Sequence, residues 1–187
     1  MLSTQAKQLM QQYKTQFMQD CAELTPKLTA FIQEILQGRH WFFSDENKAF
    51  DQAVALIMEY DYQDFSVCGW LRNQNGSYLG DRIIDFPEEC LPKFDADVED
   101  EIYGLGQGIN GKYQVWDAVD DFYSGLYEHF DRWFTDCFRT AAQNTASTLP
   151  AYFAMCVTNS YTNLATMQKE LCDDIAQKFG WASFWQD

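Results

Sequence analysis

Apolar residues recur every three or four positions near the start of the chain, which is the spacing of one face of a helix. The residues that follow this spacing are Leu9, Tyr13, Phe17, Cys21 and Leu24. The pattern predicts helix over residues 2–37. Thr25 and Pro26 have the composition of a helix start, because a hydroxyl side chain caps free N–H groups and proline suits the first helical position. We therefore expect a break there, followed by a second helix that stops at Gly38.

A third helix is predicted from Ser44 to Glu59. Ser44 is a suitable N-cap. The side chains expected to face inward are Phe50, Val54, Ile57 and Met58.

Strand composition begins at residue 65. Residues 65–72 are rich in apolar and aromatic side chains, residues 73–76 contain Asn and Gly in a turn sequence, and residues 77–85 return with apolar side chains. This order predicts a β-hairpin, in which Gly69 marks a bulge or a close approach. Residues 86–116 show no regular period, so we expect a long acidic loop with short helical pieces.

The strongest helical pattern runs from Asp117 to Asn144, with nine apolar residues at helical spacing. Residues 151–158 follow as a strand that is apolar on both faces. Asn163 is a suitable cap for a final helix that closes at Gly180. These elements predict an α+β fold: a mainly helical single domain over residues 1–187, with a small, about three-stranded antiparallel or mixed sheet made of 65–72, 77–85 and 151–158.

Composition supports a packed core, because 47% of the residues are hydrophobic and 17% are aromatic. The formal net charge is −15, and residues 81–121 supply much of it with 12 acidic and three basic residues. Such acidity argues against binding to nucleic acid or to an anionic membrane. It favours a basic protein partner. The alternative is that the acidity only keeps an aromatic-rich protein hydrated.

The N-terminus is polar, without the pattern of an export signal, and the chain has no apolar run of the roughly 18 residues that a membrane span needs. The six cysteines are scattered and form no C-x-x-C pair. We expect a reducing, cytoplasmic location without disulfides or a zinc site.

Two motifs fail on physical grounds. Residues 106–111 match G-x-G-x-x-G, but an acidic stretch precedes them where a dinucleotide site needs a buried strand. Asp95, Asp97 and Glu99 imitate a calcium loop that lacks its glycine and its bidentate glutamate. We expect no cofactor and no metal, although a loose divalent-cation site stays open.

On the long helix, His129 fits a structural role better than that of a ligand. Glu128 and Arg132 have the spacing of a helix ion pair. No residue is assigned a catalytic role.

The candidate binding surface combines carboxylates with aromatic side chains, a composition suited to a partner rich in Arg and Lys. Its predicted members are Asp95, Asp97, Glu99, Asp100, Glu101, Tyr103, Tyr113 and Trp116. The alternative for the aromatic residues is that they close the core over the hairpin.

In charge, size and helix-hairpin-helix order the whole chain resembles the small acidic α+β immunity proteins with which bacteria block toxins. The resemblance implies a cytoplasmic protein that occludes a toxin domain, such as a nuclease with a basic active site. Two alternatives stay open: a carboxylate-based hydrolase, with or without a divalent metal, and an inhibitor that mimics the phosphate backbone of a nucleic acid.

Overall fold

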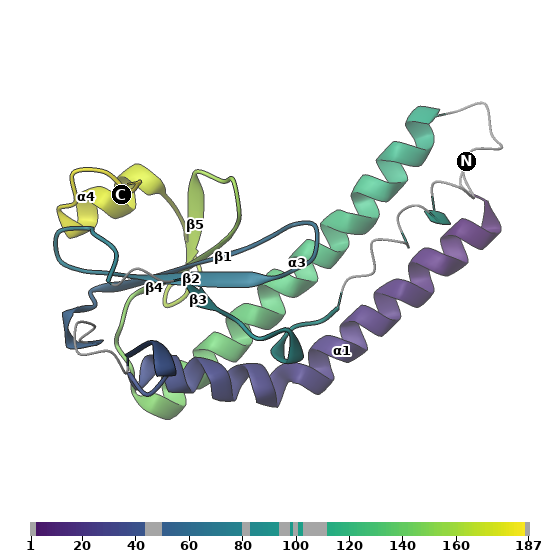
Figure 1. Cartoon of the computed structure of the whole chain (residues 1–187). Helices are drawn as coiled ribbons and strands as arrows, with labels where there is room; N and C mark the ends of the chain where they lie inside the picture. The colour runs from purple at the N-terminus through teal and green to yellow at the C-terminus, as the bar shows by residue number, and fades with distance from the viewer. Residues whose placement is uncertain are drawn as a thin grey trace.

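The computed structural model describes residues 3–43, 50–79, 83–93, 98, 101–102 and 112–185, and for Phe42 and residues 112–116 it describes the backbone alone. Two long helices, α1 (Thr4–Leu36) and α3 (Lys112–Thr145), lie on one side of a mixed sheet, and α4 (Cys172–Phe179) lies on the other (Figure 1). Short 3-10 helices occur at Trp41–Phe43, Phe50–Gln52 and Glu88–Cys90. None of the described helices is both long and apolar enough to cross a membrane.

The sheet contains six strands in the described part of the chain, in the order β3-β2-β1-β4-β5-β6. Their bounds are β1 Ala55–Tyr60, β2 Val67–Arg72, β3 Ile84–Asp85, β4 Ala151–Met155, β5 Ser160–Asn163 and β6 Lys169–Leu171. β1 pairs with β4 in parallel, and the other pairs are antiparallel. The fold is α+β, but the predicted three-stranded sheet is wrong because β1, β5 and β6 were not recognised as strands.

β1 was predicted as the end of a helix over 44–59. Residues 44–49 lie outside the described residues, and residues 55–60 form a central strand whose two faces are both covered. A strand of this kind is apolar at nearly every position. Ile57 and Met58, together with Phe50 and Val54, therefore satisfied helical spacing although they lie in or just before a buried strand, and the sequence pattern alone did not separate the two.

The predicted final helix over 163–179 is wrong in its first half. Asn163 ends β5 and stabilises the hairpin turn to β6, because its Oδ1 accepts hydrogen bonds from the N–H groups of Ala165 at 3.0 Å and Thr166 at 3.2 Å. The same side chain that caps a helix also stabilises a turn in this way. The helix begins at Cys172 and ends before Gly180, whose φ of 73° is the left-handed conformation expected of a glycine there.

The break predicted at Thr25 and Pro26 is also wrong, because α1 continues through both residues. Thr25 does not act as a cap: its hydroxyl donates to the Cys21 carbonyl at 2.9 Å and accepts from Trp133 Nε1 at 2.9 Å. Pro26 and Ala22 are both exposed. Water can therefore reach the Ala22 carbonyl, which has no helical N–H partner at Pro26.

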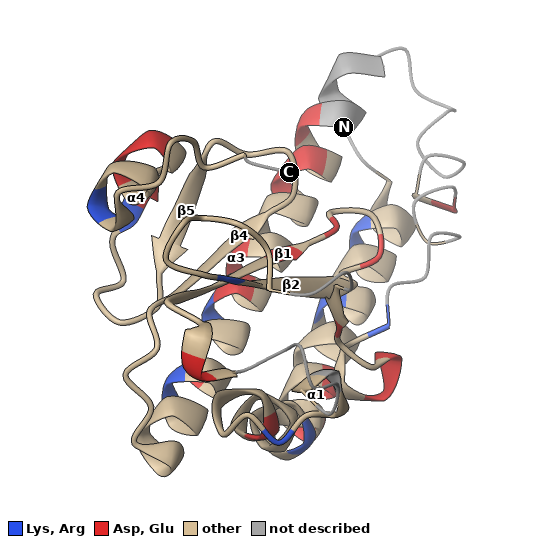
Figure 2. Ribbon diagram, turned by 60° about the vertical axis from the view of Figure 1, so that its left-hand side comes forward, with Lys and Arg blue, Asp and Glu red and all other residues tan. Residues whose placement is uncertain are grey.

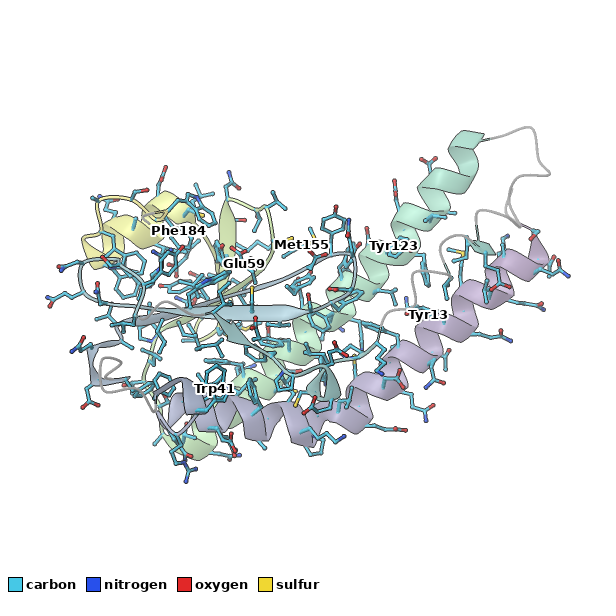
Figure 3. The ribbon with its side chains drawn as sticks, viewed as in Figure 1. Tyr13, Trp41, Glu59, Tyr123, Met155 and Phe184 are labelled. Carbon is cyan, nitrogen blue, oxygen red and sulfur yellow. The ribbon has the colours of Figure 1, made fainter. Side chains whose placement is uncertain are left out.

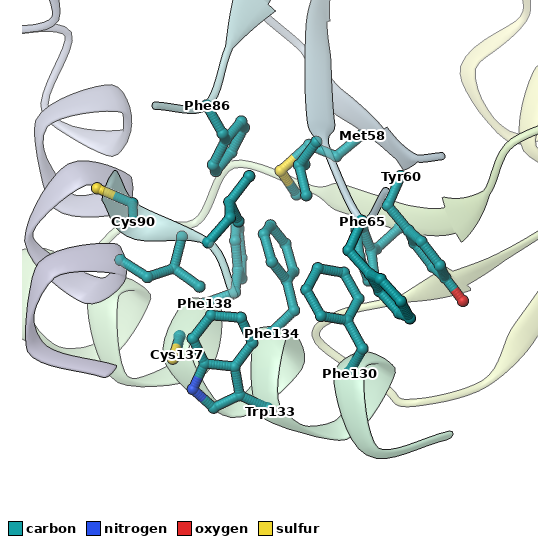
Figure 4. Close-up of a cluster of buried hydrophobic side chains, with 14 of the residues drawn as sticks. Met58, Tyr60, Phe65, Phe86, Cys90, Phe130, Trp133, Phe134, Cys137 and Phe138 are labelled. Carbon is teal, nitrogen blue, oxygen red and sulfur yellow. The ribbon is translucent and has the colours of Figure 1, made fainter. Parts of the chain in front are cut away.

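α3 is the central core helix, as predicted from its apolar face. It runs in the same direction as α1, so that Tyr13 meets Phe122 near the beginning of both helices and Thr25 meets Trp133 further along. Where α3 faces the sheet, Phe134, which Figure 4 shows among the buried aromatic side chains, stacks on Phe153 of β4. The ring centroids are 4.1 Å apart. A second apolar cluster fills the other face, beneath α4 and the C-terminal segment, where Tyr161, Trp181 and Phe184 are buried.

The predicted turn at residues 73–76 is confirmed, and it connects to this second cluster. The Gly76 N–H donates to the Asn73 carbonyl at 3.0 Å. Arg72, which precedes the turn, is buried and donates to the carbonyls of Gly76 at 2.7 Å and Phe184 at 3.1 Å. The guanidinium also lies 3.7 Å from the centre of the Tyr78 ring. Arg72 thus attaches the C-terminal segment to the sheet.

Candidate functional site

Most of the predicted binding surface cannot be placed. Asp95, Asp97, Glu99, Asp100 and Tyr103 lie outside the described residues, as does the glycine motif at 106–111. Glu101 is exposed in a short helical piece beside the buried Ile102. Tyr113 and Trp116 lie in the first turns of α3, so the prediction that the loop extends to residue 116 is wrong. Their side chains belong to the part that the structure does not describe.

A cavity of about 300 Å³, lined by both polar and apolar side chains, lies along the flank of α3, next to strands β4 to β6. Ser160 and Thr162 of β5 share one face of the sheet with Lys169 of β6, since Thr162 pairs directly with Lys169. These side chains form one wall, and α3 forms the opposite wall. We call this the α3–β6 cavity; its lining residues are Tyr60, Ser124, Tyr127, Glu128, Asp131, Phe153, Ala154, Met155, Thr158, Ser160, Thr162 and Lys169.

A hydrogen-bonded pair, Tyr60 and Asp131, forms the base of the cavity. Tyr60 is 2% exposed, and its hydroxyl points out of the aromatic core (Figure 4) and donates to the Asp131 carboxylate. Asp131 as a whole residue keeps solvent contact, but protein atoms crowd its carboxyl group, and this burial raises its pKa. The hydrogen bond from Tyr60 and the nearby Lys169 ammonium both lower the pKa of Asp131. Burial also raises the pKa of Tyr60.

The charges in the cavity do not cancel. Glu128 and Asp131 contribute two carboxylates, whereas Lys169 contributes one ammonium group. No described Lys or Arg lies within 4.0 Å of either carboxylate as an ion pair, and the predicted pair between Glu128 and Arg132 is not formed. The cavity therefore has a surplus of one negative charge.

The acidic character continues along α3 toward its beginning. Asp117, Asp121, Glu128 and Asp131 recur at intervals of three, four and seven, which places them on one side of the helix. Asp120 lies beside them, and all five residues are exposed. We call these five residues the α3 acidic stripe; Figure 2 marks the acidic positions of α3 in red.

A second, more open hollow adjoins the cavity across the loop that joins β4 to β5. It is lined by Glu59, Trp185 and residues 155–159. Val157 in this loop is 92% exposed and has a φ of 62°, and Trp185 is 57% exposed. A left-handed conformation at a β-branched residue is strained, and such strain often accompanies a binding loop. Glu59, labelled with Met155 in Figure 3, accepts a hydrogen bond from the Tyr161 hydroxyl, and burial raises its pKa.

The other candidate ligands have structural positions. His129 packs edge-on against Phe17, with ring centroids 6.4 Å apart, and burial lowers its pKa. All six cysteines are unpaired. Among the residues that the structure describes, no three His, Cys, Asp or Glu side chains come together as a metal-binding group.

The predicted binding residues end at Trp116, in the first turns of α3, and no carboxylate further along the helix was among them. The helical spacing of Asp117, Asp121, Glu128 and Asp131 was a readable signal. The contribution of Lys169 was not readable, because only the position of β6 in the sheet brings it next to α3.

The chain matches no protein-family model, no curated protein and no solved structure. Its function must therefore be argued from its own residues.

Proposed function

We propose that this chain is an acidic protein-binding module that neutralises a basic partner, in the manner of a bacterial toxin-immunity protein that acts in the cytoplasm. The observation that carries the proposal is the α3 acidic stripe, which ends in a cavity with a surplus negative charge. Five exposed carboxylates on half of one helix attract a basic surface over a distance of about a Debye length. They thereby raise the rate of encounter with such a partner.

Apolar side chains beside the cavity support the proposal. Met155, Val157 and Trp185 are all exposed at the same end of the sheet. Protein interfaces commonly combine an aromatic or Met anchor with a charged rim. The α3 acidic stripe would steer the partner toward this surface, and the three apolar side chains would contact the bound partner.

The two alternative functions receive less support. A hydrolase would use the raised pKa of Asp131, but Glu128 and Asp131 are three residues apart on one helix and approach a ligand from the same side. A glycosidase-type carboxylate pair instead flanks the bond that it cleaves. A nucleic-acid mimic would imitate the phosphates of two strands, whereas the described stripe forms a single row.

The test is to express this chain together with the polypeptide encoded next to its gene and to measure growth and complex formation. We expect the neighbouring product to arrest growth alone, and this chain to relieve the arrest by binding it. Asp117→Asn with Asp121→Asn should slow association about threefold to tenfold at low salt, with little effect at high salt.

Glu23→Gln with Glu34→Gln is the matched control, because it removes the same charge from exposed positions on α1. The control pair should slow association less than the α3 pair. If the two pairs slowed association equally, the rate would depend on the net charge of the protein and not on the position of the α3 carboxylates. A neighbouring product that this chain neither binds nor neutralises would refute the proposed function.

A further inference from the structure

We infer that the α3–β6 cavity is a receptor for one guanidinium group, the side chain of an arginine on the partner's surface. The inference rests on the proposed function for the identity of the partner, but not for the chemistry of the cavity.

The size of the cavity is the first argument. Pockets for drug-sized ligands have volumes of about 300–1,000 Å³. At about 300 Å³ this cavity lies at the lower limit and suits a single side chain.

Charge is the second argument. With Glu128 and Asp131 on one wall and Lys169 on the other, the cavity carries a surplus of one negative charge. One monovalent cation balances it, whereas an anion would meet two carboxylates. Because the cavity is partly enclosed by protein, the attraction is less screened than on an open surface.

The placement of the carboxylates favours guanidinium over ammonium. Residues three apart on a helix have neighbouring side chains, so Glu128 and Asp131 present their oxygens together. Asp131 already accepts one hydrogen bond from Tyr60 and retains further acceptor sites. The planar fork of a guanidinium, with five donors, can bond both carboxylates at once, whereas an ammonium behaves as a compact point charge.

The remaining walls fit the rest of an arginine side chain. Phe153 and Met155 supply apolar surface for its methylene groups. Tyr127 supplies further aromatic surface to the lining, which suits a guanidinium. The Tyr127 hydroxyl donates to the Tyr62 carbonyl at 3.2 Å, and its ring lies beside that of Phe65. These contacts hold the ring in place before a ligand arrives, which lowers the entropic cost of binding.

Lys169 has a specific role in this arrangement. It is exposed, lines the cavity and is attracted to Asp131 without forming an ion pair within 4.0 Å. A guanidinium that enters the cavity replaces Lys169 as the cation attracted to Asp131, and the Lys169 ammonium repels it. Removing Lys169 should therefore strengthen binding, an outcome that a purely structural cavity would not produce.

The experiment is a titration of the isotope-labelled protein with N-acetyl-arginine amide, followed by NMR. The neutral isostere N-acetyl-citrulline amide and N-acetyl-lysine amide serve as comparison probes. We expect saturable shifts confined to Tyr60, to residues 124–131 and to β4–β6, with the arginine probe binding more tightly than both others. Asp131→Asn should weaken binding about tenfold, which corresponds to about 1.4 kcal/mol. Lys169→Ala should tighten it about twofold to fivefold at low salt, and Lys7→Ala, on exposed α1 surface, should leave it unchanged.

Equal binding of the citrulline probe, shifts elsewhere in the protein, or unaltered affinity in Asp131→Asn would each overturn the inference. If Asp131→Asn does not fold, Glu128→Gln provides the same test, because Glu128 is exposed and belongs to the same pair of carboxylates. The two proposals fail separately. If the arginine probe binds but the neighbouring gene product does not, the proposed function fails and the receptor stands. If the partner binds but the probe does not, the receptor fails and the proposed function stands.

Discussion

Replacing Phe134 by Ala should remove a large part of the protein's stability. Phe134 is completely buried, stacks on Phe153 at 4.1 Å with an interplanar angle of 12°, and lies 5.5 Å from the Phe86 ring. Burying an aromatic side chain removes about 150–250 Å² from water, which at about 25 cal/mol per Å² corresponds to roughly 4–6 kcal/mol as an upper limit. Measured Phe→Ala substitutions in cores cost about 3–5 kcal/mol. We expect a loss of about 4 kcal/mol.

Urea unfolding monitored by circular dichroism measures this loss. For a typical slope of about 2 kcal/mol per molar urea, the midpoint should fall by about 2 M while the slope stays constant. Phe134→Leu keeps most of the apolar volume and should cost less than half as much. Met18→Ala changes a side chain that is 41% exposed on α1 and should alter stability by less than about 0.5 kcal/mol.

Trp133→Ala provides a second measurement of the same core. Trp133 is buried against α1, and its Nε1 donates to the Thr25 hydroxyl, so its loss should cost about 3–5 kcal/mol as well. If Phe134→Ala and Trp133→Ala each cost less than about 1 kcal/mol, the packing of α3 between α1 and the sheet would be assigned wrongly.

Three further predictions concern other parts of the molecule. Arg72→Lys keeps the charge but replaces the two guanidinium nitrogens that bond the carbonyls of Gly76 and Phe184 with a single ammonium nitrogen. Urea unfolding should therefore show a loss of about 1.5–3 kcal/mol, and an unchanged midpoint would contradict this role. Alkylation of the unreduced, denatured protein should add six labels by mass spectrometry, and four or fewer would indicate a disulfide or a metal. His40 has a pKa lowered by burial, so the unfolded chain takes up its proton first, and the free energy of unfolding should fall as the pH drops below about 6.5. In His40→Phe the free energy of unfolding should fall less steeply between pH 7.5 and 5.5. An unchanged pH dependence in this variant would argue against a role for His40.

Local signals determined several elements correctly. The apolar face of α3, the apolar and aromatic run of β2, the Asn-Gly turn at 73–76 and the glycine stop at Gly180 were all read from neighbouring residues. Each of these signals depends on contacts within one element or with the next one. Helical spacing, turn residues and caps act over a few positions, so a single sequence contains them in full.

Contacts between distant segments decided the rest. β1 became a strand because β4, about 95 residues later in the chain, covers one of its edges and β2 the other. A short apolar run fits a helix or a buried strand equally well until its neighbours are known.

The α3–β6 cavity also depends on contacts between distant segments. The acidic spacing on α3 is visible in the sequence, but Tyr60, Asp131 and Lys169 come from three separate elements. The pairing of β1 with β4, of β4 with β5 and of β5 with β6 brings them together, because side-chain proximity across a sheet is set by strand order and register.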